Sequence, residues 1–191
     1  MKKYTDYLDK MMDLVRNTQC YQRTSRIENW DEAFDTLCSM FFEAREHQKH
    51  VFFIGNGGSA AIAAHMTADF MKNGGLHTVG LYDNALTTCM GNDYGYEYVF
   101  SKPLEFLMRE DDLLVAISSS GNSQNIVNAV EVARSKKGKV ITFSGFGEDN
   151  KIKQMGDYNL YVPIKHYGMV ESIHNLFLQQ IVDVLAGDDD V

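Results

Sequence analysis

The feature that most restricts the fold is an apolar run that ends in a cluster of hydroxyl groups, within residues 111–123 (DDLLVAISSSGNS). Residues 113–117 contain no polar side chain, as expected of a strand buried on both faces of a parallel sheet. A turn rich in Ser, Gly and Asn follows at once. After the turn, apolar residues recur at helical spacing at Ile126, Val127, Val130 and Ala133. The order of strand, turn and helix therefore places several hydroxyl groups at the N-terminus of a helix.

Such a turn suits a phosphate group, because the first N–H groups of a helix are unpaired and the helix dipole favours an anion. The alternative is an ordinary loop whose serines only cap the helix. One Ser or Asn is enough for a cap, whereas this turn surrounds Gly121 with four Ser and one Asn. We therefore favour a phosphate-binding loop at residues 118–123.

Other short apolar runs alternate with helical patterns along the chain. Strands are expected at residues 51–54, 78–82, 139–143 and 158–162, and helices at 60–71, 102–108, 151–155 and 168–186. This alternation indicates right-handed crossovers and a parallel sheet covered by helices on both faces, which is an α/β fold. Two further helices, at about 4–15 and 31–46, are expected before any strand. In such sheets, ligands bind beyond the carboxyl ends of the strands.

Length and composition are those of one globular domain. Of the 191 residues, 45% are hydrophobic and 23% are charged, which is enough for a sizeable core. We found no linker or repeat, so a single domain is expected over residues 1–191. Its leading helices, within residues 1–48, are candidates for subunit contacts, and residues 187–191 form an acidic tail.

Charge and cysteine content restrict the partners and the compartment. The net charge is -8 and Lys and Arg do not cluster, so neither nucleic acid nor an anionic membrane is an expected partner. No apolar run reaches the length of a membrane span, and no secretory signal is recognisable. Cys20, Cys38 and Cys89 lack the spacing of a metal site and are expected to be free thiols. A cytoplasmic protein is the resulting prediction.

A second glycine-rich turn, GNGGSA at residues 55–60, also lies between a strand and a helix. It satisfies G-x-G-x-x-A, one form of the dinucleotide-binding fingerprint. A dinucleotide site also needs an acidic residue about 20 positions further on, and the nearest candidate, Asp83, comes late. A dinucleotide would also leave the serine-rich loop without a role. Two loops rich in Gly, Asn and Ser better suit one sugar phosphate, with one loop for the phosphate and the other for the sugar hydroxyls.

Four titratable side chains are candidates for acid–base or metal chemistry. His65 and Asp69 are four residues apart, and Glu171 and His174 are three apart, so each pair shares one face of a helix. Imidazole with carboxylate is a common ligand set for transition metals. Spacing alone leaves two alternatives open, one shared site or two unrelated pairs. Asp93, within GNDYG, is expected from its neighbours to form an Asx turn rather than to act in catalysis.

Three motifs, in this order, resemble the SIS (sugar isomerase) domain. They are GNGGSA at 55–60, GNDYGYEYVFSKPLE at 91–105 and SSSGNS at 118–123, and KVITFSG follows at 139–145. The similarity runs from about Ile27 to Leu185 and is greatest to phosphoheptose isomerases and to the DnaA-associating initiation protein of the same branch. It implies a five-stranded parallel sheet in a three-layer α/β/α sandwich. It also implies a homotetramer with active sites between subunits.

The resemblance further implies a reaction and the residues that carry it. Phosphoheptose isomerases convert sedoheptulose 7-phosphate to the aldose D-glycero-D-manno-heptose 7-phosphate and bind zinc. The residues that would hold the phosphate are Ser118, Ser119, Ser120 and Ser123, and those that would contact the sugar are Asn56, Gly57, Ser59 and Asp93. The implied metal ligands are His65, Asp69 and His174, and the implied catalytic residues are Asp69, Glu171 and His174.

The sequence departs from the family pattern at three positions. Asp69 replaces a Glu, which keeps the carboxylate but shortens its reach, and His174 stands at a Gln position. Val182 occupies the position of a second His and can neither titrate nor bind a metal. Two hypotheses follow. The chain is a phosphosugar isomerase of the phosphoheptose type, which we favour, or a non-catalytic phosphosugar-binding or adaptor protein that keeps the phosphate loops.

Overall fold

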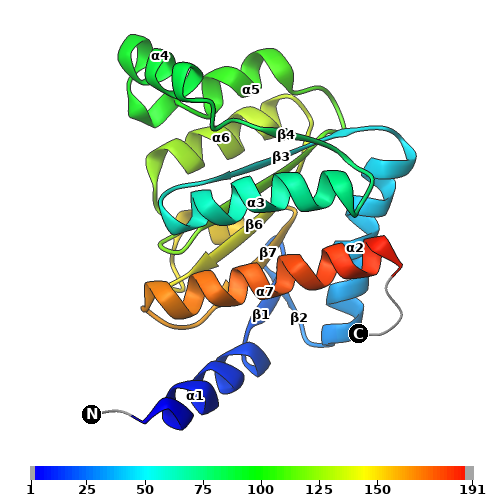
Figure 1. Cartoon of the computed structure of the whole chain (residues 1–191), viewed down its shortest axis with the longest axis vertical. Helices are drawn as coiled ribbons and strands as arrows, with labels where there is room; N and C mark the ends of the chain where they lie inside the picture. Colours follow the sequence, from blue (N-terminus) through cyan, green and yellow to red (C-terminus); the bar gives the residue numbers. More distant parts are fainter. Residues whose placement is uncertain (1–2, 188–191) are drawn as a thin grey trace.

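The computed structural model describes residues 3–187, and its centre is one seven-stranded sheet (Figure 1). The strand order is β2-β1-β7-β6-β5-β3-β4. The parallel strands are β3 (His50–Gly55), β4 (His77–Gly80), β5 (Leu113–Ser118), β6 (Lys139–Gly145) and β7 (Tyr158–Val162). These are the five strands expected from the sequence. Every residue of β5 is buried, as its unbroken apolar run predicted.

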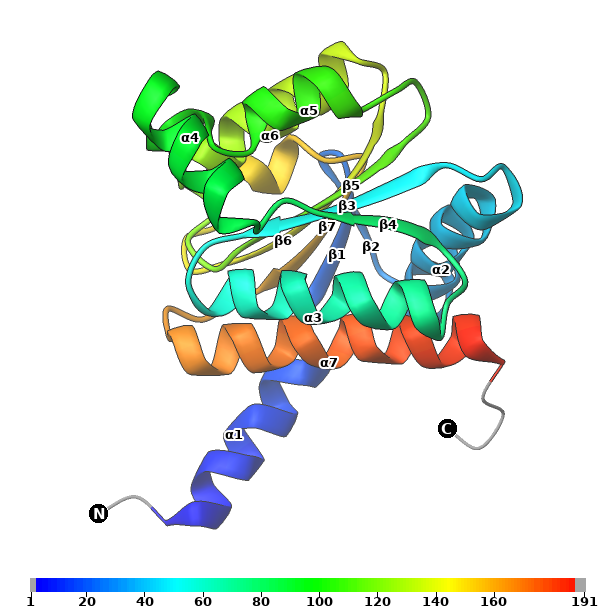
Figure 2. The same ribbon diagram turned by 45° about the horizontal axis from the view of Figure 1, so that its top comes forward.

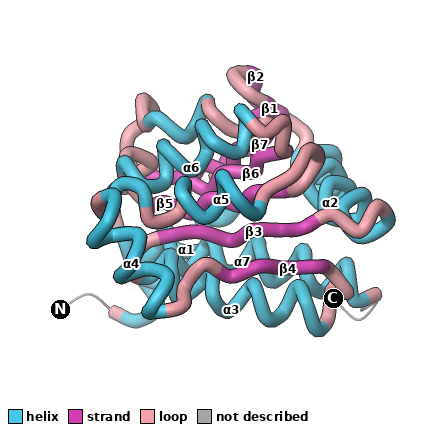
Figure 3. Tube along the Cα trace, turned by 90° about the horizontal axis from the view of Figure 1, so that it is seen from above, coloured by secondary structure: helices cyan, strands magenta, loops and turns pink. Residues whose placement is uncertain are grey.

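The prediction of a five-stranded sheet is wrong by two strands. A hairpin of β1 (Gln19–Gln22) and β2 (Ser25–Ile27) extends the sheet, and β1 pairs antiparallel with β7 at the edge visible in Figure 3. The hairpin also overturns the expectation that no strand comes before the second helix. Both strands are short and carry polar residues, and only Cys20 is buried, so they show no apolar run.

Helices cover both faces of the sheet (Figure 2). One layer contains α2 (Trp30–Glu46), α3 (Gly58–Lys72) and α7 (Tyr167–Ala186), and the other contains α4 (Asn84–Tyr94), α5 (Ser101–Leu107) and α6 (Gln124–Ser135). Side chains of β3 alternate between the two cores, with Val51 and Phe53 on one face and Phe52 and Ile54 on the other. The predicted three-layer α/β/α sandwich is therefore confirmed.

Helix α4 lies where a turn was expected at residues 91–96. Asp83 caps its start by accepting a hydrogen bond from the Leu86 N–H (2.9 Å), and Gly95, with φ of 99°, ends it. None of its residues is buried, so the segment lacks the apolar period by which helices are recognised. A one-turn 3₁₀ helix, η1 (Tyr96–Tyr98), follows it, and the helix expected at 151–155 is a second one, η2 (Lys151–Gln154).

Helix α1 (Tyr4–Arg16) projects away from the body of the protein (Figures 1 and 2). Its exposed apolar side chains are Tyr4, Tyr7, Leu8 and Met12. At the other end, α7 stops at Gly187, and the rest of the predicted acidic tail lies outside the described residues. Within residues 3–187, no helix is both long enough and apolar enough to span a bilayer.

Candidate active site

The glycine-rich turn after β3 and the serine-rich turn after β5 lie side by side at the carboxyl edge of the sheet. Their strands are adjacent and parallel, with Gly55 opposite Ile117. The two turns share a cavity of about 340 Å³. Its lining residues are Asn56, Gly57, Gly58, Ser59, Ser118, Ser119, Ser120, Ser123, Tyr167 and Glu171. All the predicted substrate-binding residues except Asp93 therefore line one cavity.

The start of α3 forms one wall, and it depends on two glycines. Gly57 has φ of 55° and ψ of -122°, a backbone conformation that favours glycine. A Cβ at Gly58 would collide with the carboxylate of Glu171. The missing side chain thus lets α7 bring a carboxylate against the first turn of α3. Burial raises the pKa of Glu171 above its usual value, because the charged form loses hydration.

Most hydroxyl groups of the serine-rich turn do not cap α6. Ser123 is the N-cap residue, yet its side chain makes no capping bond. The Ser118 Oγ accepts from the Gly121 N–H (3.2 Å) and the Ser120 Oγ accepts from the Asn122 N–H (3.3 Å). These bonds shape the turn itself. The alternative of serines that only cap the helix is therefore not what the structure shows.

Ser119 differs from its neighbours because its buried Oγ has no hydrogen-bond partner among the described residues. A buried hydroxyl without a partner costs about 1–3 kcal/mol of folding free energy. Since Ser119 lines the cavity, an oxygen-rich ligand would supply the missing bond. The Ser119 hydroxyl is therefore available to bind a polar ligand in the cavity.

The turn is supported from behind by the segment that follows β6. The Ile152 N–H donates to the Gly121 carbonyl (3.1 Å), and the Lys151 N–H donates to the Asn122 Oδ1 (3.1 Å). Gly121 has φ of 64°, and a Cβ there would collide with the Asn150 side chain. The shape of the turn is therefore fixed in the absence of ligand, which reduces the entropy lost on binding.

His174 does not lie where a catalytic or metal-binding role would place it. The ring is fully buried, and its Nε2 lies 3.1 Å from the Ser144 carbonyl oxygen. A carbonyl only accepts, so Nε2 carries the proton and Nδ1 is unprotonated. Nδ1 has no hydrogen-bond partner among residues 3–187. Burial lowers the pKa of His174 to about 4. The imidazole is therefore neutral near pH 7.

His65 and Asp69 form a separate pair on α3. The His65 Nε2 lies 3.1 Å from the Asp69 Oδ2, and the imidazole is mostly exposed. In the described part of the chain, no three His, Cys, Asp or Glu side chains are grouped closely enough to hold a metal ion. The predicted set of His65, Asp69 and His174 thus does not form a metal site within one chain. The reason is that α7 directs His174 into the core, whereas His65 faces solvent.

Asp93 lies on the last turn of α4 and does not line the cavity. It is exposed, and its carboxylate accepts from the Cys89 thiol (3.6 Å) and the Asn92 amide (2.9 Å). Being helical, it does not form the expected Asx turn. Two lining residues were missed by the sequence analysis, Gly58 and Tyr167. Tyr167 is the first residue of α7 and packs on Phe146, and one aromatic at the start of a helix gives no sequence signal.

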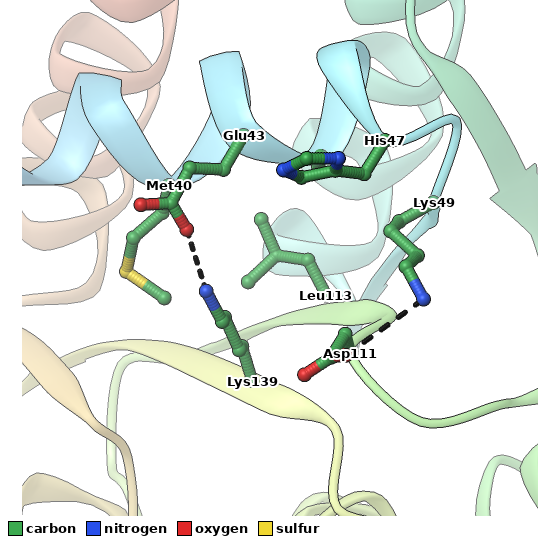
Figure 4. A pocket seen from close by; sticks show the side chains of 8 residues that line it. Met40, Glu43, His47, Lys49, Asp111, Leu113 and Lys139 are labelled. Carbon is green, nitrogen blue, oxygen red and sulfur yellow. Dashed lines mark hydrogen bonds and ion pairs between the residues drawn. The ribbon is translucent and has the colours of Figure 1, made fainter.

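A larger hollow of about 690 Å³ lies at the opposite edge of the sheet, where β5 and β6 begin (Figure 4). Its charges neutralise one another, since Lys139 pairs with Glu43 (2.6 Å) and Lys49 pairs with Asp111 (3.8 Å). The C-terminal end of α2 also faces it, and that end of a helix dipole disfavours anions. The smaller cavity, with its free hydroxyl and helix N-termini, is the better anion site.

Comparisons with known proteins identify the family to which the chain is similar. Residues 16–145 match the family model of the SIS domain. The phosphoheptose isomerase of Aliarcobacter butzleri is 35% identical over 168 residues, which cover 85% of this chain and 88% of the relative. That of Serratia proteamaculans is 39% identical over 136 residues, 69% of each chain. The solved phosphoheptose isomerase GmhA of Neisseria gonorrhoeae superimposes with a TM-score of 0.82 at 28% identity, covering 96% of both chains.

Proposed function

This chain belongs to the SIS-domain family, in its phosphoheptose isomerase branch, and we propose that it interconverts the ketose sedoheptulose 7-phosphate and the corresponding aldose phosphate. One observation carries the proposal. The serine-rich turn, the start of α3 and the Glu171 carboxylate converge on a single cavity. The turn provides a place for the phosphate, and the carboxylate provides a base beside the sugar.

The reaction needs a base that moves one proton between adjacent carbons. Glu171 takes the proton from the carbon next to the carbonyl, which leaves an enediolate and a protonated carboxyl group. The carboxyl group returns the proton to the former carbonyl carbon, while a hydroxyl proton shifts between the two oxygens. Atoms and charge balance without an oxidant or reductant. The raised pKa of Glu171 suits this role, because a base acts best when its pKa approaches the working pH.

The other predicted catalytic residues have less support. Asp69 is paired with His65 outside the lining of the cavity, so its role stays a prediction. His174 is buried and neutral, which argues against proton transfer by this ring. A zinc ion at His65 and Asp69 also stays a prediction. Two side chains are too few for a protein zinc site, so at least one further ligand would have to come from another subunit.

We also propose a homotetramer in the cytoplasm. The three free cysteines suit a reducing compartment. The exposed apolar side chains of α1 suit burial against other copies of the chain. Light scattering should give four times the chain mass of 21.6 kDa. The double substitution Leu8→Asp with Met12→Asp should reduce the particle mass, whereas Lys10→Asp, on a different side of α1, should not. An unchanged mass in the first variant would rule out α1 as a subunit contact.

The activity is tested by incubating the purified protein with sedoheptulose 7-phosphate and following the sugar by NMR, with and without added zinc. We expect signals of the aldose phosphate to appear. Calorimetry on the same sample measures binding. Binding without any aldose product would contradict the isomerase proposal and favour the non-catalytic phosphosugar-binding protein.

Ser119→Ala separates ligand binding from folding. The substitution removes a buried hydroxyl that has no partner among residues 3–187, so the free energy of unfolding should stay the same or rise by up to about 1 kcal/mol. Phosphate binding should weaken by about tenfold, because the ligand loses one hydrogen bond. Urea unfolding and calorimetry with inorganic phosphate measure the two effects. Ser135→Ala, in the exposed last turn of α6, is the control. A less stable Ser119→Ala protein with unchanged phosphate affinity would contradict the assignment.

A further inference from the structure

A reciprocal pair of amides joins the two turns of the cavity. The Asn56 Nδ2 donates to the Asn125 Oδ1 (2.8 Å), and the Asn125 Nδ2 donates to the Asn56 Oδ1 (2.9 Å). Asn56 follows β3 and lines the cavity, whereas Asn125 is the buried second residue of α6 and does not line it. The pair therefore ties the glycine-rich turn to the helix that follows the serine-rich turn.

A third side chain acts on the same amide. The Tyr96 hydroxyl, from η1, donates to the Asn56 Oδ1 (3.0 Å). A side-chain amide oxygen accepts two hydrogen bonds, and its nitrogen donates two. Both acceptor positions of Asn56 are thus filled, and one of its two N–H groups is filled. A single N–H is left for a ligand in the cavity.

We propose that Asn125 and Tyr96 are positioning residues, which hold the Asn56 amide so that it donates a hydrogen bond to an oxygen atom of the bound sugar phosphate. The nature of this ligand rests on the proposed function. If the Asn56 amide turned over, like atoms of the two amides would face each other and both bonds between them would be lost. The reciprocal pair therefore holds the plane of the Asn56 amide, and in the orientation of the structure the Tyr96 hydroxyl donates to its oxygen. In this orientation, the glycine-rich turn offers the sugar a donor and no acceptor from this side chain.

The test compares two ligands by calorimetry, sedoheptulose 7-phosphate and inorganic phosphate. Inorganic phosphate reports on the serine-rich turn alone, so the ratio of the two dissociation constants isolates the contacts to the sugar. Asn125→Ala should lower the preference for the sugar phosphate by about tenfold. Tyr96→Phe should lower it by less than about threefold, because Asn125 still holds both ends of the amide. The double variant should lose more than the product of the two, since the residues act on one group.

Asn56→Asp tests the direction of the hydrogen bond directly. Aspartate keeps the shape but only accepts, and the inorganic phosphate measurement corrects for its added charge. We expect the preference for the sugar phosphate to fall by about tenfold or more. Tyr94→Phe, in the neighbouring helix α4, is the matched control for Tyr96→Phe, and this variant should bind both ligands as the wild type does. Because Tyr96 is exposed, Tyr96→Phe and Asn56→Asp keep the test valid if Asn125→Ala does not fold.

Two results would overturn the inference. One is an unchanged preference in Asn56→Asp. The other is an equal loss of affinity for both ligands in Asn125→Ala, which would mean that the pair only supports the loops. Failure of the proposed function looks different, because a wild-type protein that binds the sugar phosphate without isomerising it still yields both dissociation constants. Neither variant series relies on turnover.

Discussion

Glu171→Gln should lower kcat by about 10²- to 10⁴-fold and change KM little. The amide fills the same space against Gly58 but cannot take up a proton, and general bases contribute about this much to enzymatic rates. The same variant should lose the acidic limb of the pH profile. In the wild type, kcat should fall as the pH drops through the raised pKa of Glu171, because only the ionised carboxylate acts as a base.

The control for this experiment is Glu131→Gln, the same substitution at an exposed position of α6. It should leave kcat, KM and the pH profile as they are. A Glu171→Gln enzyme that keeps more than about a tenth of the wild-type kcat would move the role of base to another residue. Asp69 would be the next candidate, since it is the other carboxylate that the sequence analysis placed in catalysis.

His174 should make the stability of the protein depend strongly on pH. In the folded protein its pKa is about 4, whereas in the unfolded chain it is near the usual 6.5. Between these values the unfolded state binds a proton that the folded state does not, so stability rises with pH. The contribution is complete above about pH 6.5 and is lost as the pH falls towards 4. Over the whole window it amounts to about 3 kcal/mol.

Urea unfolding between pH 7.5 and pH 4.5 measures this contribution. The free energy of unfolding of the wild type should fall more steeply than that of His174→Leu, and the difference between their slopes belongs to the buried imidazole. His47→Gln, at an exposed histidine, should follow the wild type. Equal slopes for wild type and His174→Leu would mean that His174 becomes protonated in the folded state over this pH range. Its predicted role in catalysis would then regain support.

The parallel sheet was predictable because its strands carry unbroken apolar runs. The β5 residues are buried on both faces, so the sequence shows the burial directly. The β1–β2 hairpin gave no such signal, because one strand at the edge of a sheet needs few apolar residues. Helix α4 was hidden for a similar reason, since a helix with no buried residue has no apolar period. Both were specified by tertiary contacts and caps rather than by pattern.

The place of the cavity could be predicted from the topology of the sheet. The positions of the titratable side chains around it could not. Adjacent parallel strands end at the same edge, so the turns after β3 and β5 had to meet. Helical spacing predicts that Glu171 and His174 lie near one face of α7, but it says nothing about depth. The three residues from Glu171 to His174 advance about 4.5 Å along the axis, which is enough to pass from the rim of a cavity into the core. His174 therefore lies in the core, whereas Glu171 lines the cavity.

From the closeness of Glu171 to Gly58, at the start of α3, we also expect the cavity to discriminate between sugar phosphates by their charge. A sugar that carries phosphate at both ends would bring its second dianion towards an ionised carboxylate in a partly enclosed space, where like charges repel strongly. Monophosphates meet no such opposition at their neutral end. The same carboxylate would therefore disfavour the binding of bisphosphates, independently of its role as a base, and Glu171→Gln would weaken that exclusion while it slows turnover.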